Sequence, residues 1–170
     1  RLYGMGDAKL CHHINLPTIW KEIRGEPREV AGPEGQAIID QFNKFAPWIV
    51  GLTKAAAKVA GQKGYVWTAL RRKCRFPYEG AGKYGWTHKA FNRIGQGTAA
   101  DQMKATLIAA DAEGIPIQMA VHDEFDFSFT DINQAKRLKE LQMTVVKFSV
   151  PMKVDLEIGD DWGNLTKVTD

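Results

Sequence analysis

Residues 115–129 constrain the fold of this chain most, because apolar residues alternate with other residues on both sides of a short polar break. The alternating apolar positions are Ile115, Ile117, Met119, Val121, Phe125, Phe127 and Phe129. Only His122, Asp123 and Glu124 separate the two arms. Period-two alternation around such a break is typical of a β-hairpin with one buried face. The sequence therefore predicts a hairpin whose tip carries two adjacent carboxylates and an imidazole.

The tip of this hairpin fits two interpretations. Asp and Glu are common in turns because they are soluble and bond their own backbone, so Asp123 and Glu124 suit an ordinary polar turn. Carboxylates on a rigid hairpin also suit a hard divalent cation, which prefers oxygen ligands. The hairpin alone favours the polar turn, and the choice depends on the segment before it.

A long helix is predicted upstream of the hairpin, over His88–Glu113, with Gly114 as its stop signal. Gly95 and Gly97 lie inside this helix, and each weakens it by roughly 1 kcal/mol relative to Ala. We therefore expect another backbone or a ligand to approach the helix closely at these glycines.

Three polar residues of this helix, His88, Asn92 and Gln96, are spaced by four positions and should share one face. Amide side chains suit the minor groove of a nucleic acid, where every base pair offers a hydrogen-bond acceptor. A solvated polar helix face is the alternative.

Positive charge is concentrated in residues 51–100, which hold ten Lys or Arg and one acid, Glu79. That segment has a net charge of +9, whereas the whole chain has only +3. The densest basic cluster consists of Arg71, Arg72, Lys73 and Arg75. Such asymmetry is expected where one face meets a polyanion, and phosphate contacts give affinity rather than sequence choice. A solvated loop tip is the alternative.

The remaining pattern indicates an α+β fold. Helices are predicted over residues 7–14, 34–45, 48–60 and 132–148, and strands over residues 65–70 and 152–158. Residues 15–32, which Pro17, Gly25 and Pro27 interrupt, and the glycine-rich residues 77–85 are predicted to be irregular. Helices interspersed with strands, and a hairpin between two of the helices, favour α+β over a parallel α/β fold.

Cysteine usage and hydropathy exclude some classes of protein. Cys11 and Cys74 provide no disulfide framework and indicate a reducing compartment. The run Cys11-His12-His13 lacks the paired spacing of a zinc site. No apolar run approaches the roughly 20 residues that span a membrane, so we expect no membrane partner and a location in the cytoplasm.

Two stretches in this order and spacing identify a family. Residues 92–104 read Asn-Arg-Ile-Gly-Gln-Gly-Thr-Ala-Ala-Asp-Gln-Met-Lys, and residues 121–124 read Val-His-Asp-Glu. Together they resemble the C-terminal part of family A DNA polymerases, which include bacterial DNA polymerase I and many phage replicative enzymes. Matching pieces elsewhere extend the resemblance over nearly the whole chain; these are Tyr3-Gly4-Met5, Gly64-Tyr65-Val66 with Thr68, and Gly159-Asp-Asp-Trp162.

The resemblance implies a partial polymerase palm, an antiparallel sheet whose catalytic hairpin packs on helices, together with part of the fingers. Residues 1–63 would then be a helical fingers portion and residues 64–170 a palm portion. Members from phages often have His at the position of His88, which favours a phage source and action in the cytoplasm of the host cell.

The resemblance also implies roles for individual residues. Asp123 matches a catalytic aspartate that binds metal, and Glu124 matches a neighbouring acid that supports the catalytic site. The residues that match DNA contacts are His122 at the primer terminus, Asn92 and Gln96 in the minor groove, Tyr3 beside the nascent base pair, His88, and Arg71 and Arg72 at phosphates.

The implied activity is template-directed DNA synthesis from dNTP on primer–template DNA, with two Mg²⁺ ions in the complete site. In this family the first metal aspartate belongs to a motif that would lie upstream of Arg1. We therefore expect a fragment or split half that needs an upstream polymerase segment as its partner and is not competent alone.

Two other functions remain open. One is a fragment of a single-subunit phage-type RNA polymerase, although those enzymes usually have Ser at the position of Glu124. The other is a non-catalytic palm module that only binds DNA, against which the presence of Asp123, Asn92 and Gln96 argues.

Overall fold

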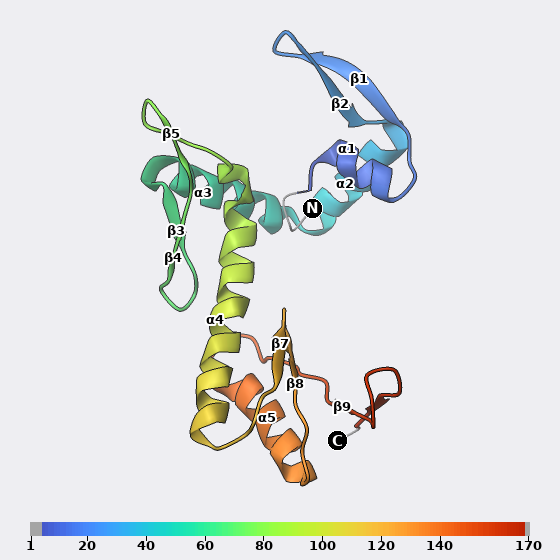
Figure 1. Ribbon diagram of the computed structural model, residues 1–170. Coiled ribbons are helices and arrows are strands. Elements are labelled where there is room, and N and C mark those ends of the chain that lie inside the picture. Colours follow the sequence, from blue (N-terminus) through green and yellow to red (C-terminus); the bar gives the residue numbers. More distant parts are fainter. Residues whose placement is uncertain (1–4, 169–170) are drawn as a thin grey trace. The chain divides into compact units, whose positions relative to one another are not determined.

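The computed structural model describes residues 5–168, and these fall into two compact units that divide between Gly97 and Thr98. The division lies inside helix α4 (Ala90–Ala112), the longest helix of the described residues, which is visible along its length in Figure 1. Both units combine helices with two-stranded antiparallel sheets. The predicted α+β class is therefore confirmed.

The first unit begins with a helix, a hairpin and a second helix. Their bounds are α1 Asp7–His13, β1 Thr18–Ile23, β2 Glu26–Ala31 and α2 Pro33–Phe45. Cys11, Ala31 and Ile39 form a small buried core where α1, β2 and α2 meet. The helices predicted over residues 7–14 and 34–45 are thus confirmed to within a residue at each end.

The prediction of an irregular segment over residues 15–32 is wrong, because β1 and β2 form a hairpin there. Arg24 and Gly25 form its turn, with φ of 57° and 79°. Positive φ at both turn residues matches the twist of the strands, but Arg is an unusual residue at the first position. Pro27 lies on β2, and a two-stranded sheet has only edge strands, which tolerate proline.

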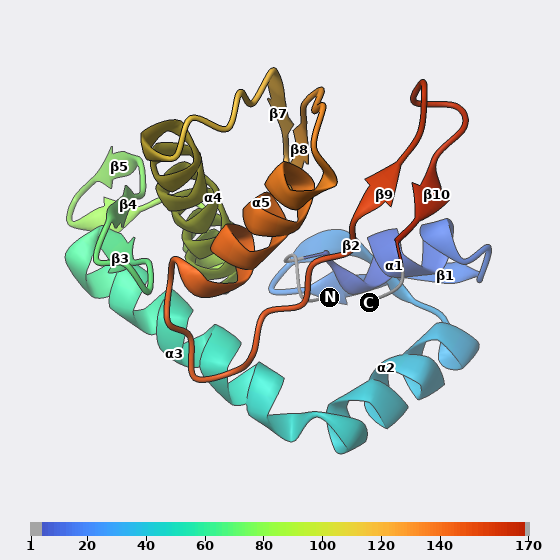
Figure 2. The ribbon, with the colours of Figure 1, turned by 90° about the horizontal axis from the view of Figure 1, so that it is seen from below.

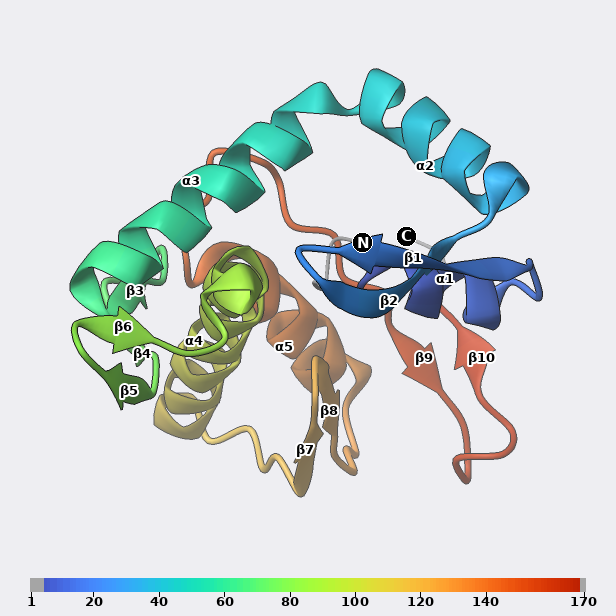
Figure 3. The same ribbon diagram turned by 90° about the horizontal axis from the view of Figure 1, so that it is seen from above.

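The rest of the first unit packs on helix α3 (Pro47–Lys63), and Figure 3 shows the short strands gathered at its C-terminal end. These strands are β3 Tyr65–Trp67, β4 Lys73–Arg75, β5 Tyr78–Gly80 and β6 Lys83–Tyr84. The core of this part consists of Ala56, Ala60, Val66, Phe76 and Ala90. Residues 77–85, predicted to be a loop, instead form the β5–β6 hairpin.

The predicted division into fingers (1–63) and palm (64–170) stays a prediction. By packing alone, β3 and the following strands belong with α3, because Val66 and Phe76 share a core with Ala56 and Ala60. The compact units therefore divide at a different place from the polymerase regions that the resemblance implies.

The second unit contains most of α4, the predicted hairpin and a further helix. Its elements after α4 are β7 Met119–Val121, β8 Glu124–Asp126, α5 Ile132–Thr144, β9 Glu157–Ile158 and β10 Thr166–Lys167. Figures 1 and 2 show α5 and the β7–β8 hairpin beside the C-terminal part of α4. Ala110, Ile115, Leu138 and Leu141 form the core between these elements.

Three boundaries in the second unit differ from prediction. The helix predicted over residues 132–148 ends at Thr144, and the strand predicted over residues 152–158 is limited to β9. The hairpin arms pair over only three residues each, although the alternation is longer.

In residues 5–168, no helix has both the length and the apolar character that crossing a membrane requires.

The β1–β2 hairpin should lose stabilisation in acid. Glu29 on β2 accepts a hydrogen bond from the Thr18 hydroxyl (2.6 Å) and lies 2.8 Å from the ring of His12. The Thr18 bond, with help from His12, holds the pKa of Glu29 below its ordinary value. A carboxylate with a lowered pKa stabilises the folded state above its unfolded pKa, and that contribution is lost as pH falls through the folded pKa.

We therefore expect Glu29→Gln to destabilise the hairpin at pH 7 and to have a smaller effect at pH 3. Hydrogen exchange of the β1 and β2 amides measures the effect locally. Glu22→Gln makes the same change of charge on the same hairpin and serves as the control. If Glu29→Gln had the same effect at both pH values, the ionised Glu29 carboxylate would not stabilise the hairpin through Thr18 and His12.

Candidate functional site

The β7–β8 hairpin places the predicted site residues at its tip. Val121 pairs with Glu124, so His122 and Asp123 are the two turn residues. His122 has φ of 55°, in the left-handed region that His enters more readily than most residues. All three residues from His122 to Glu124 are exposed. The hairpin itself is confirmed, and its tip presents two carboxylates to solvent. The predicted buried face is wrong for the first arm, because all three residues of β7 are exposed.

Packing and hydrogen bonds both hold this hairpin. Phe125 and Phe127 pack against the core of the second unit. At the tip, the side-chain amide of Gln142 on α5 donates to the backbone carbonyl of Asp123 (3.2 Å). The Gln142 backbone carbonyl in turn accepts a bond of 2.7 Å from the amide of Gln102 on α4. Neither glutamine was predicted from the sequence, because no local pattern links positions this far apart.

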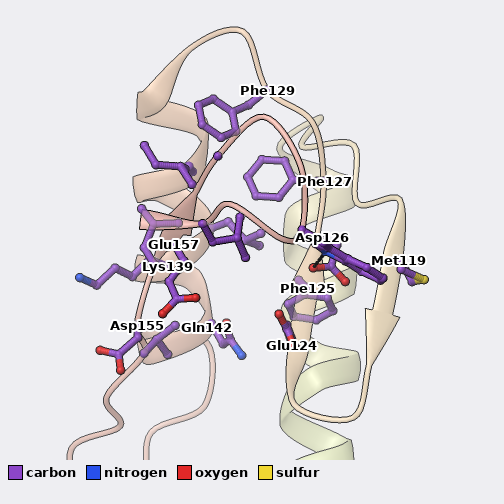
Figure 4. Close-up of a pocket in the computed structure, with 18 of the residues that line it drawn as sticks. Met119, Glu124, Phe125, Asp126, Phe127, Phe129, Lys139, Gln142, Asp155 and Glu157 are labelled. Atoms are coloured by element: carbon purple, nitrogen blue, oxygen red, sulfur yellow. Dashed lines mark hydrogen bonds between the residues drawn. The ribbon is translucent and has the colours of Figure 1, made fainter. Parts of the chain in front are cut away.

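A cavity of about 740 Å³ lies beside the hairpin, between β8, α5 and residues 153–165. Figure 4 shows Glu124, Phe125 and Asp126 on one wall, opposite side chains of α5 and of the C-terminal segment. Asp126 Oδ1 accepts a bond of 3.2 Å from the Trp162 indole, whereas its Oδ2 is buried and has no hydrogen-bond partner among residues 5–168. Asp126 was not foreseen, although the run Asp-Glu-Phe-Asp placed a third acid in the motif.

The described residues do not form a complete metal site. Asp123 and Glu124 offer carboxylate oxygens, the ligands that Mg²⁺ prefers. Within residues 5–168, no group of three His, Cys, Asp or Glu side chains lies close enough together to hold a metal ion. The tip therefore fits one side of a Mg²⁺ site.

The predicted polar stripe on α4 is partly wrong. His88 lies in a 3₁₀ turn over Thr87–Lys89, and α4 begins only at Ala90. Trp86, with φ of 56°, precedes this tighter turn, so His88 does not continue the α-helical stripe. Asn92 and Gln96 do lie one turn apart on α4, half-buried and exposed respectively.

A shallow basic groove brings Gln96 together with the predicted arginine cluster. It is lined by Arg72, Lys73, Cys74, Arg75, Arg93, Gln96 and Gly97. The Arg72 guanidinium donates to the Gly97 carbonyl (3.0 Å), which ties the β3–β4 hairpin to the first turns of α4. Arg71 lies outside the groove, exposed in the β3–β4 turn with φ of 66°.

Lys73 and Arg75 of this groove belong to the predicted basic cluster, whereas Arg93 was not predicted to contact DNA. Arg93 donates to the Arg75 carbonyl (2.8 Å) and lies over the Phe76 ring (4.9 Å). Its position directly after Asn92 was the available signal. Tyr3, predicted beside the nascent base pair, lies outside the described residues.

Comparison with known proteins decides the family. The model of DNA polymerase family A matches residues 1–164. The chain belongs to DNA polymerase family A. The DNA-directed DNA polymerase of Pseudomonas phage M6 is 40% identical over 184 aligned positions, which cover 95% of this chain and 27% of that relative. Thermostable DNA polymerase I of Thermus aquaticus is 26% identical, over 95% of this chain and 19% of its own length.

A solved structure of a polymerase domain shares the fold. It is the POL domain of Pol1 from M. smegmatis, in complex with DNA primer-template and dNTP, with a TM-score of 0.68 and 21% identity. The match covers 89% of this chain and 27% of that chain. The chain thus spans about a quarter of the phage relative and of this structure, and the predicted polymerase palm and fingers architecture is confirmed at the level of fold.

Two glycines of α4 should respond oppositely to alanine. A Cβ at Gly97 would lie 2.8 Å from Thr68 Cγ2 and 3.2 Å from the Arg72 guanidinium, whereas a Cβ at Gly95 would meet nothing within 4 Å. Gly97→Ala should destabilise the chain by about 1–3 kcal/mol through overpacking. Gly95→Ala should stabilise it by up to about 1 kcal/mol through helix propensity.

Denaturant unfolding of the two variants beside the parent chain measures both effects. The sequence predicted that another part of the chain or a ligand approaches the helix closely at both glycines. In the structure, such an approach occurs at Gly97 but not at Gly95. Equal effects of the two substitutions would contradict the packing of the β3–β4 hairpin on α4.

Proposed function

We propose that this chain forms part of the catalytic centre of a template-directed DNA polymerase, in which Asp123 binds catalytic Mg²⁺. The observation that carries the proposal is the position of Asp123, exposed in a two-residue turn of a hairpin that is fixed from behind. Family membership gives this position a chemistry, since the relatives are named DNA polymerases.

The arrangement of Asp123 suits metal binding. Gln142 bonds its backbone carbonyl, and no hydrogen bond or ion pair within residues 5–168 engages its carboxylate. A carboxylate that is exposed while its backbone is held can approach a cation without first breaking an internal bond. Bound Mg²⁺ would lower the pKa of the primer 3′-hydroxyl and offset charge on the triphosphate. Glu124, next along β8, would add negative charge beside it.

The basic groove supports a primer–template partner. Arg72, Lys73, Arg75 and Arg93 line one concave surface, and Gln96 lies among them. Cations would contact phosphates without sequence preference, while an amide at the edge of the groove would donate to minor-groove acceptors. Asn92, one turn before Gln96, extends the same polar surface. His88, His122 and Arg71 remain further proposed contacts.

The rest of the metal site would come from another part of the polymerase. Mg²⁺ demands near-octahedral oxygen ligands, so two such ions need more carboxylate than Asp123 and Glu124 offer. We propose that an upstream polymerase segment supplies the second aspartate and the groups that hold dNTP. In a phage enzyme, synthesis would take place in the cytoplasm of the host cell. No observation favours RNA synthesis over DNA synthesis.

Substitution of Asp123 tests the proposal in the polymerase that carries this chain. Asp123→Ala should lower single-nucleotide incorporation by roughly a thousandfold, because several kcal/mol of charge stabilisation is lost. Affinity for primer–template DNA should change little, since the groove cations are intact. Rapid-quench incorporation and fluorescence anisotropy measure the two quantities.

Asp111→Ala provides the control, because Asp111 is an exposed acid at the far end of α4. It should leave incorporation within about twofold.

The 170-residue chain alone should bind DNA but not extend a primer. Incorporation that survives Asp123→Ala would refute the metal role. Salt-dependent DNA binding without activity in any context would favour the non-catalytic module.

A further inference from the structure

The side chains behind the hairpin tip form a short hydrogen-bond relay between three elements of the second unit. Gln102 on α4 donates to the Gln142 backbone carbonyl at 2.7 Å, and the Gln142 amide donates to the Asp123 carbonyl at 3.2 Å. The same Gln142 nitrogen lies 3.5 Å from the sulfur of Met103. The relay therefore connects α4 to α5, and α5 to the turn residue at the tip.

The geometry points to Gln142 as a positioning residue that sets the orientation of Asp123, with Gln102 fixing Gln142 in turn. This inference rests on the proposed metal role of Asp123. Gln142 would touch neither substrate nor metal, and it would act through the backbone of the residue that does.

The chemistry of the contact fixes which end of Gln142 faces the turn. A backbone carbonyl only accepts, so the amide nitrogen, rather than the amide oxygen, must point toward Asp123. Gln142 is half-buried and Gln102 is only 6% exposed, so the bond between them is partly shielded from competing water, whereas the bond from Gln142 to Asp123 is exposed. An apolar residue of similar length at position 142 would fill the same space but would leave the Asp123 carbonyl without this donor.

The turn needs such a restraint because little else holds it. His122 has φ of 55°, and His122, Asp123 and Glu124 are all exposed. The arms pair over only three residues each, so the tip is at the end of a short ladder. Fixing the Asp123 carbonyl limits rotation of the peptide that follows and so narrows the directions in which the carboxylate projects. A preorganised ligand binds metal more tightly than one that must be ordered on binding.

Gln142→Met tests the inference in the polymerase that carries this chain, because methionine keeps the length and removes the donor. Affinity for Mn²⁺, read by electron paramagnetic resonance of the complex with primer–template and dNTP, should fall roughly fivefold, the loss expected for one hydrogen bond. Incorporation at limiting metal should fall by a similar factor and recover at saturating metal. Affinity for primer–template DNA should not change.

A second readout does not depend on metal or activity. The carbonyl ¹³C chemical shift of Asp123 should move in Gln142→Met toward that of a carbonyl without a protein donor. Gln134→Met makes the same change on the same helix and should alter neither the shift nor the metal affinity. If Gln142→Met lowers the melting temperature more than Gln134→Met does, Gln102→Leu repeats the measurements one step further back in the relay.

The outcomes separate this inference from the proposed function. Unchanged Mn²⁺ affinity in Gln142→Met, in an enzyme that Asp123→Ala inactivates, would overturn the positioning role and leave the metal role intact. An unchanged carbonyl shift would overturn it as well. If Asp123→Ala itself leaves metal affinity and incorporation unchanged, the proposed function fails and the positioning role fails with it.

Discussion

Burial of Phe125 and Phe127 against the core of the second unit is the interaction on which the candidate site depends. Glu124, Phe125 and Asp126 line the same cavity, and Asp126 Oδ2 is buried, so β8 does not divide into one apolar and one solvated face. The two rings hold the strand against the core, and a slip of one residue would move both rings off it. The same burial brings the hairpin tip within reach of α5, where Gln142 bonds Asp123. Hydrophobic packing thus fixes the register, and a polar bond then fixes the end of the turn.

Helix α4 takes part in both compact units and carries two different tasks. Its first turns present Asn92 and Gln96 and pack closely on the β3–β4 hairpin, where Gly97 leaves room for Arg72. Its later turns supply Gln102 to the relay behind the hairpin. In the account proposed above, one helix therefore serves both the DNA-contacting groove and the metal-binding turn. A substitution near the middle of α4, where the two units divide, can therefore affect the stability of either unit.

The features that sequence predicted are those encoded locally. The β7–β8 hairpin follows from alternation, and the end of α4 follows from Gly114, whose φ is 70°. The Arg24–Gly25 hairpin was missed because Arg is an unusual residue for its left-handed turn position. Residues that act through distant partners also escaped notice. Gln142 meets Asp123 across 19 positions, and only the fold could reveal that contact. The family resemblance identified Asp123 as a site residue, but it did not identify Gln142, which bonds the Asp123 carbonyl.

The central claim is that the turn at Asp123 binds the catalytic metal, and metal-directed cleavage of the protein tests it most directly. Fe²⁺ replaces Mg²⁺ in the complex of the polymerase with primer–template DNA and dNTP, and added peroxide cuts the backbone beside the ion. Mass spectrometry then locates the cuts. The account predicts cleavage within residues 121–125, suppressed by excess Mg²⁺. If the enzyme is active but its backbone is cut mainly outside residues 121–125, the metal does not bind at Asp123.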